Sequence, residues 1–155
     1  GYDRGHLAPA ASMAWSKEAM SESFFLSNMS PQKPGFNRGI WKKLEAKVRD
    51  FARQHGTVVV ITGPVLEGGL LEIGPSGLDI PRAYYKVILD VTEPTIEGIA
   101  FVLPNESSKR PLRRFAVTID YVEDMTGINF FEALEDDLEQ QIEGSYSVQH
   151  WDITQ

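Results

Sequence analysis

The side chains with the clearest chemical potential lie in two short stretches of the first third of the chain. Residues 3–6 read Asp-Arg-Gly-His, and residues 27–45 carry amide, carboxylate and arginine side chains. A neutral imidazole can act as a general base near pH 7, amide and carboxylate oxygens suit a hard cation, and guanidinium groups bind phosphate. This combination indicates metal-assisted cleavage of a phosphodiester. The residues concerned are Asp3, Arg4, His6, Asn28, Asn37, Arg38 and Glu45, and Arg49 follows just beyond the second stretch.

The three histidines are not equivalent candidates. A lone histidine is more often structural than catalytic. His55 lies where a helix is expected to end and should interact with the helix dipole, and His150 lies in a tail. His6 differs because an acid, an arginine and a glycine come just before it. His6 is therefore the candidate base.

One helix should position most of the second stretch. Apolar residues recur at spacings of four, four and three, which predicts a helix that ends at Gly56. A second stripe at steps of four lies on its flank. Considered alone, Asn37 could equally be a helix N-cap, and Glu45 and Arg49 could be an ordinary surface pair. The apolar face consists of Ile40, Leu44, Val48 and Phe51, and the flanking stripe of Asn37, Trp41, Glu45 and Arg49.

The remaining elements alternate irregularly, which favours an α+β fold with a largely antiparallel sheet flanked by helices. We expect one domain over residues 1–155. Buried strands are predicted at residues 24–27 and 57–62, further strands at 83–91 and 96–103, and surface loops at 65–81 and 105–111. Short helices are predicted from Ser16 to Met20, from Thr118 to Met125 with Gly127 as a stop, and at residues 134–142.

Composition and charge limit the functional classes. The chain lacks cysteine, so disulfides and thiolate metal sites are excluded, and no apolar run is long enough to span a membrane. The net charge of −7 at first argues against a nucleic-acid partner. Residues 1–57 nevertheless carry +4 and residues 58–155 carry −11. We expect the basic helix to face a polyanion and the acidic segment from Asp120 onward to point away; the alternative is a solvated acidic tail without a role.

Several ordered blocks resemble the DNA/RNA non-specific endonucleases with a ββα-metal motif, a family that includes secreted bacterial nucleases and mitochondrial endonuclease G. The resemblance covers most of the chain in the same order. The blocks are DRGHLAP at 3–9, SNMSPQ at 27–32, FNRG at 36–39 with Trp41 and Leu44-Glu45, VITGP at 60–64, IP at 80–81, YKV at 85–87, TG at 126–127 and FF at 130–131.

This resemblance implies roles for individual residues. His6 would be the general base, and Asn37 would be the direct protein ligand of one Mg²⁺ ion, for which Mn²⁺ could substitute. Glu45 would hold a water of the metal's shell that protonates the leaving group, so that 5′-phosphate and 3′-hydroxyl ends result. The implied catalytic residues are His6, Glu45, Arg4 and Asn28; the implied substrate-binding residues are Arg38, Lys42 and Arg49; and Asp3 would be structural.

The resemblance also raises alternatives. Members of the family have a sheet segment before the Asp-Arg-Gly-His block that contributes an arginine, and we expect this segment to be missing from residues 1–155. The rival functions are an inactive nucleic-acid- or protein-binding relative and a phosphohydrolase of small molecules. The implied partners are DNA and RNA, a second copy in a homodimer, and a protein inhibitor, with no membrane. The family predicts a secreted or periplasmic location, with a mitochondrial one as the alternative.

Overall fold

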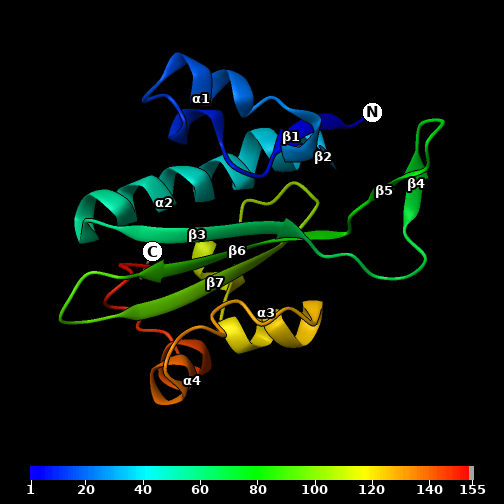
Figure 1. The fold of residues 1–155 in the computed structure, drawn as a ribbon. Coiled ribbons are helices and arrows are strands. Elements are labelled where there is room, and N and C mark those ends of the chain that lie inside the picture. Colours follow the sequence, from blue (N-terminus) through cyan, green and yellow to red (C-terminus); the bar gives the residue numbers. More distant parts are fainter. Residues whose placement is uncertain (154–155) are drawn as a thin grey trace.

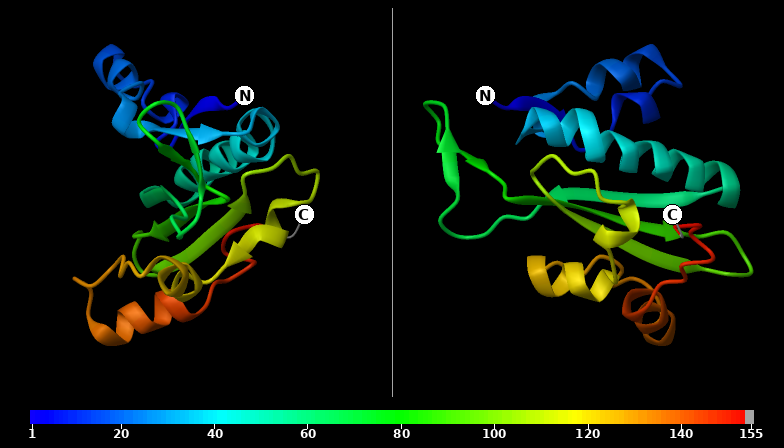
Figure 2. Two further views of the ribbon diagram at one scale, coloured as in Figure 1. Left: turned by 90° about the vertical axis from the view of Figure 1, so that its right-hand side faces the viewer. Right: turned by 180° about the vertical axis from the view of Figure 1, so that it is seen from behind.

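A computed structural model describes residues 1–153 as a four-stranded antiparallel sheet between two layers of helices. The long helix α2 and the β1–β2 pair cover one face, while α3 and α4 cover the other (Figures 1 and 2). This arrangement confirms the predicted α+β class. The strands are β1 (Asp3–His6), β2 (Met29–Gln32), β3 (Val58–Pro64), β4 (Leu71–Ile73), β5 (Leu78–Ile80), β6 (Ala83–Asp90), β7 (Glu97–Pro104) and β8 (Ala116–Val117). The helices are α1 (Lys17–Glu22), α2 (Lys42–His55), α3 (Ile119–Thr126) and α4 (Asp136–Gly144), with short helical turns η1 (Ala10–Ser12), η2 (Leu26–Asn28), η3 (Phe36–Trp41) and η4 (Leu112–Phe115).

Strand β6 lies inside the sheet and organises both layers. The strand order is β3-β6-β7-β8, and β6 pairs along its whole length with β3 and β7. Because side chains alternate across a strand, Tyr84 and Ile88 join the core under α2, whereas Tyr85 and Val87 join the core under α3. The sheet therefore separates two apolar clusters.

The predicted long helix is confirmed, with one difference at its start. Leu44, Val48 and Phe51 are buried on one face of α2, and Gly56 ends the helix with a φ of 95°. Before α2 the chain makes the wide π-type turn η3, interrupted at Gly39 by a non-helical conformation. π-type turns are rare in proteins, and those that occur are often found at functional sites.

The predicted ends of the short helices are largely confirmed. The Ser16 side chain accepts a hydrogen bond from the amide of Ala19, and the Thr118 side chain accepts one from the amide of Tyr121. Gly127 takes the left-handed conformation that follows α3. Among residues 1–153, no helix combines the length and apolar character needed to cross a membrane.

One strand prediction was wrong, and another was wrong in part. Residues 24–27 form turns and the start of η2, and Phe24, Phe25 and Leu26 are exposed. The amides of Phe24 and Phe25 bond to carbonyls three residues back, as in a helical turn, and among the described residues the segment belongs to no strand. The strand predicted at 57–62 exists as β3, but it is a sheet edge and leaves Val59 and Val60 exposed.

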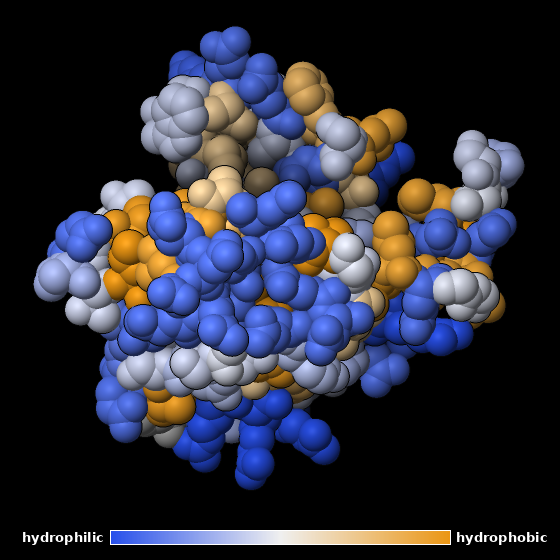
Figure 3. Space-filling model, turned by 60° about the horizontal axis from the view of Figure 1, so that its bottom comes forward, coloured by the Kyte–Doolittle hydropathy of each residue, from blue (hydrophilic) through white to orange (hydrophobic). Residues whose placement is uncertain are grey.

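The predicted loop at residues 65–81 contains a two-stranded hairpin. Strands β4 and β5 pair around a turn in which Gly74 and Gly77 have positive φ. The hairpin stands away from the body of the protein (Figure 1), and hydrophobic side chains gather on it at the right of Figure 3. Leu71 and Leu78 are among these exposed residues. The glycine-rich composition therefore predicted the turn correctly, but the two short strands on either side of it were not predicted.

The β1–β2 pair is tied to the sheet by a buried tyrosine. The hydroxyl of Tyr84 lies 2.7 Å from Ser30 Oγ and donates to the carbonyl of Pro31 at 2.9 Å. Burial raises the pKa of Tyr84 to about 12, so it stays a neutral donor. Asn105 also donates to the Pro31 carbonyl, at 3.1 Å. These contacts fix β2 above β6.

We expect Tyr84→Phe to lower the free energy of unfolding by about 1–3 kcal/mol, because it leaves buried polar groups of β2 with fewer partners. The adjacent Tyr85→Phe is the matched control, since the Tyr85 hydroxyl has no hydrogen-bond partner within residues 1–153. Urea denaturation of both variants measures the difference. Equal losses of stability would contradict the role of the Tyr84 hydroxyl.

Candidate active site

The Asp-Arg-Gly-His block forms β1, which pairs antiparallel with β2 so that His6 lies opposite Met29 and Gly5 opposite Ser30. A Cβ atom at Gly5 would overlap the side chain of Gln32, which is fully buried. Glycine is therefore required here by packing. The close contact between Gly5 and Gln32 keeps β1, and with it His6, in a fixed position relative to β2.

His6 lies half-buried beside an aromatic ring. The edge of one ring meets the other, with the centroids of His6 and Phe24 4.6 Å apart. Burial lowers the pKa of His6, so the neutral imidazole is favoured. Nε2 is buried without a hydrogen-bond partner, which leaves Nδ1 as the nitrogen open to a water molecule. The Trp41 indole contacts the carbonyl of His6 at 3.4 Å and anchors its backbone.

Asp3 connects β1 to η3. Its Oδ2 accepts from the Asn37 side-chain amide and from Arg38 Nε, both at 2.9 Å, and its Oδ1 accepts from Arg38 Nη2 at 2.7 Å. The arginine lowers the pKa of Asp3 and keeps the carboxylate ionised. Because a carboxylate only accepts, the amide nitrogen of Asn37 must face it. The carbonyl oxygen of Asn37 therefore points elsewhere and remains available to a cation.

This geometry excludes one of the two explanations of Asn37, the helix N-cap. The residue at the start of η3 is Gly35, and η3 has no side-chain cap. Asn37 lies inside the turn, and its side chain crosses to Asp3. It is not a helix N-cap.

Asn28 holds the loop that follows His6. Its side-chain oxygen accepts from the amide of Ala8 at 2.9 Å, and its side-chain nitrogen donates to the carbonyls of Ala8 and Ser23 at 2.9 and 2.8 Å. Its own carbonyl accepts from the amide of Leu7. With these bonds made, the side chain of Asn28 acts on the site by fixing this loop.

Glu45 lines a cavity of about 500 Å³ between α2, β3 and the loop after β1. Asn28, Thr62 and Lys86 line the same cavity. Burial raises the pKa of Glu45, and the charges of Lys86, Arg49 and Lys42 oppose this rise. The carboxyl group therefore lies in a partly desolvated place with three cations nearby.

Lys86 is the residue of this region that sequence reasoning left without a role. It is 1% exposed, and its ammonium donates to Thr62 Oγ1 at 2.8 Å and to the carbonyl of Leu7 at 3.2 Å. The same group lies 4.6 Å from the centre of the Trp41 ring. Burial lowers its pKa to about 8. A lysine inside an otherwise apolar strand was the available signal.

The structure separates the predicted cations. Arg38 is exposed and held by Asp3, Lys42 is exposed on α2, and Arg49 is half-buried with Nη1 enclosed and unbonded. Arg4 is exposed beside an apolar groove lined in part by Leu26 and Leu78. Alternation along β1 places Arg4 and His6 on one side of the strand, and Asp3 and Gly5 on the other. The four cations therefore differ in exposure and in partners, and among the described residues only Arg38 is held by a residue of β1.

Two other groups of potential metal ligands lie elsewhere in residues 1–153. One consists of His55, Asp90 and His150, and the other of Asp120, Glu123 and Glu143. In the second group, burial and then the neighbouring carboxylates raise the pKa of Glu143 to about 7. Neither group includes a residue of the Asp3–Asn37 unit.

Comparison with known proteins gives a consistent result. The model of the family described as DNA/RNA non-specific endonuclease matches residues 1–137. The mitochondrial Nuclease 1 of Schizosaccharomyces pombe is 40% identical over 146 residues, which cover 83% of this chain and 45% of that protein. Mitochondrial endonuclease G of Homo sapiens is 37% identical over 143 residues, covering 84% and 48%. The mitochondrial names of these relatives do not support the predicted secreted or periplasmic location.

A solved structure agrees with the fold. The crystal structure of the EndoG/EndoGI complex, concerned with EndoG inhibition, superposes with a TM-score of 0.81 at 35% identity, covering 87% of this chain and 61% of that one. The chain spans about half the length of the curated relatives named above. By family model, sequence and structure alike, the chain belongs to the DNA/RNA non-specific endonucleases.

Proposed function

We propose that the protein is a metal-dependent endonuclease that hydrolyses the phosphodiester bonds of DNA and RNA with little sequence specificity. Membership of the family supports nuclease chemistry. The observation that carries the proposal is the bond from Asn37 to Asp3, because it orients an uncharged oxygen ligand on the same ββα unit that presents His6. A binding protein without activity would not need this arrangement.

The residues fit one hard divalent cation. The side-chain carbonyl oxygen of Asn37 would bind the cation, and the hydrogen bond from the Asn37 amide nitrogen to Asp3 would keep the side chain in that orientation. Mg²⁺ prefers oxygen ligands and keeps several waters, so a single protein ligand is sufficient; Mn²⁺ would substitute. When bound, the ion would stabilise negative charge that develops on the phosphate and the leaving oxygen.

His6 would start the reaction as general base. Nδ1 would take a proton from a water molecule as its oxygen attacks phosphorus, a contribution of about 10²–10⁴-fold. The lowered pKa of His6 keeps the imidazole neutral and ready for this step. The bond to the 3′ oxygen would break, and Glu45 would orient a water that supplies the proton to it. The products would carry 5′-phosphate and 3′-hydroxyl ends.

The basic side chains around the site would bind the phosphates of the substrate. Lys42, Arg49 and Arg38 would meet phosphates, with Arg38 already oriented by its bidentate bond to Asp3. Arg4 would meet the substrate from the side of β1 that also carries His6. Asn28 would contribute indirectly by holding the loop after His6. Phosphate contacts of this kind carry no base information, which agrees with low specificity.

Partners and location follow from the relatives. The EndoG/EndoGI complex, in which EndoG is inhibited, supports a protein inhibitor as a partner of this chain too. The mitochondrial names of the relatives support a mitochondrial location. A homodimer and a single nuclease domain over residues 1–155 stay predictions.

The direct experiment is digestion of plasmid DNA and of RNA with and without Mg²⁺, followed by identification of the ends. We expect cleavage of both polymers only with the cation, and ends that ligase joins without prior phosphorylation. Cleavage in the presence of a chelator would contradict metal dependence, and 3′-phosphate ends would contradict the proposed leaving group.

His6→Ala should reduce kcat by at least about 10²-fold, because a general base contributes about 10²–10⁴-fold. Burial lowers the pKa of His6, so the imidazole should become protonated only below about pH 6.5, the ordinary histidine value. The wild-type enzyme should therefore lose activity only when the pH falls below that value. The pH profile of kcat/KM measures this limb, and it should be absent from the variant. A folded variant within about tenfold of wild type would show that His6 is not the base.

Asn37→Ala should lose Mg²⁺-dependent turnover, because it removes the proposed metal ligand. The neighbouring Arg38→Gln is the matched control: it also breaks a bond to Asp3, yet it should raise KM for nucleic acid and leave the Mg²⁺ concentration for half-maximal rate unchanged. Rates across a Mg²⁺ series decide the point. If both variants shifted the Mg²⁺ dependence equally, Asn37 would act through Asp3 alone.

The basic face of α2 should hold the nucleic acid. Replacing Lys42 and Lys43 with alanine should reduce the slope of log affinity against log salt by about 0.7–0.9 for each phosphate that is no longer bound. Asp136→Asn with Asp137→Asn is the control on α4, across the sheet (Figure 1), where charges are screened beyond about 10 Å. Binding in a His6→Ala background across a salt series prevents cleavage during the measurement. An unchanged slope in the double lysine variant would exclude this orientation.

A further inference from the structure

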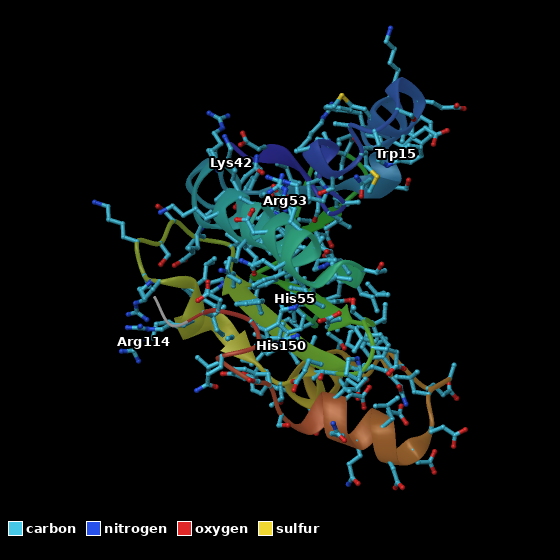
Figure 4. The ribbon with its side chains drawn as sticks, turned by 90° about the vertical axis from the view of Figure 1, so that its left-hand side faces the viewer. Trp15, Lys42, Arg53, His55, Arg114 and His150 are labelled. Atoms are coloured by element: carbon cyan, nitrogen blue, oxygen red, sulfur yellow. The ribbon has the colours of Figure 1, made fainter. Side chains whose placement is uncertain are left out.

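The two histidines that sequence analysis treated as unrelated meet at the far end of α2. His55 is the last residue of α2, Asp90 is the last residue of β6, and His150 lies in the segment after α4. Figure 4 shows His55 and His150 close together where the helix reaches the sheet. His55 Nδ1 lies 3.2 Å and His150 Nε2 3.0 Å from the same oxygen, Asp90 Oδ2.

The spacing of the three ligand atoms is that of a metal site. All three lie within 4.8 Å of one another. Ligand atoms in a tetrahedral Zn²⁺ site are about 3.4 Å apart, given bonds of about 2.0–2.1 Å. The two measured distances are only slightly shorter. The imidazole planes are 16° from parallel with centroids 4.3 Å apart, so one ring must turn to direct its lone pair at a shared ion. His55 belongs to α2 whereas His150 lies in a turn outside any helix or strand, so we assign this rotation to His150.

The surroundings favour a desolvated, oriented site. Asp90 is 2% exposed, and its second oxygen accepts from the amide of Thr92 at 2.9 Å, the kind of outer bond that fixes a ligating carboxylate. The rings of Phe51 and Trp151 border His55.

We propose that His55, Asp90 and His150 bind one Zn²⁺-class cation that ties the C-terminal segment to α2 and β6. Two imidazoles and a carboxylate suit Zn²⁺ or Co²⁺, whereas Mg²⁺ and Ca²⁺ favour oxygen ligands alone. This site is separate from the proposed nuclease metal, because His55 ends α2 whereas Asn37 precedes its first residue, and the 14 residues of α2 alone span roughly 20 Å at about 1.5 Å per residue. The site is structural and does not depend on the proposed catalytic mechanism.

The first test titrates the chelator-treated full chain with Co²⁺ in an Asn37→Ala background, which removes the proposed nuclease ligand. We expect one equivalent to give the visible absorption of four-coordinate Co²⁺, Zn²⁺ to abolish it by competition, and Mg²⁺ to leave it unchanged. Absence of a stoichiometric signal, or displacement by Mg²⁺, would overturn the proposal.

The second test compares His150→Gln and Asp90→Asn with Asp50→Asn, an exposed carboxylate on α2 that pairs with Arg53. Loss of a true ligand should weaken Co²⁺ binding by at least about tenfold, the lower bound for loss of even an outer partner. Added Zn²⁺ should raise the melting temperature of wild type and of Asp50→Asn but not of His150→Gln. If Asp90→Asn fails to fold, His150→Gln decides alone; unchanged affinity in His150→Gln would overturn the site.

Discussion

The arrangement of the candidate active site depends on the contacts of the Lys86 ammonium group. An unpaired buried charge is costly, and this one is satisfied by the Leu7 carbonyl, the Thr62 hydroxyl and the face of Trp41. Each of these three partners belongs to a different part of the fold: the end of β1, the edge strand β3 and the entry to α2. One charge in β6 therefore connects the histidine strand, the sheet and the segment η3–α2, which carries Asn37 in its turn and Glu45 in its helix.

Asp3 performs the complementary task above the sheet. Lys86 holds the sheet side of the site together, while Asp3 fixes the position of η3 relative to β1 through its bonds to Asn37 and Arg38. Both use a charged group to orient neutral or oppositely charged partners that come from distant parts of the sequence. The wide turn η3 makes this possible, because it buries Phe36, Ile40 and Trp41 together and still leaves Asn37 directed at β1.

Local periodicity predicted the helices well because each signal lies within one element. The apolar face of α2 and the Thr118 and Gly127 ends of α3 depend on neighbours within a few residues. The segment at residues 24–27 failed for the opposite reason: an apolar run predicts burial only if another element covers it, and Phe25 and Leu26 are exposed. The candidate residues His6, Asn37 and Glu45 were found from motif spacing, whereas the role of Lys86 and the meeting of His55 with His150 depend on contacts between remote segments. No local pattern encodes such contacts.

The separation of charge across the sheet has a kinetic consequence. The basic residues of α2 lie on one side, and α3 and α4, which contain no lysine or arginine, lie on the other (Figure 2). The protein therefore has a large molecular dipole moment in addition to its negative net charge. Near a polyanion, that dipole experiences a torque that turns the α2 side inward before any contact forms. If the proposed function is correct, net repulsion would slow the approach to nucleic acid, yet the molecules that arrive would do so in the orientation that presents the candidate site.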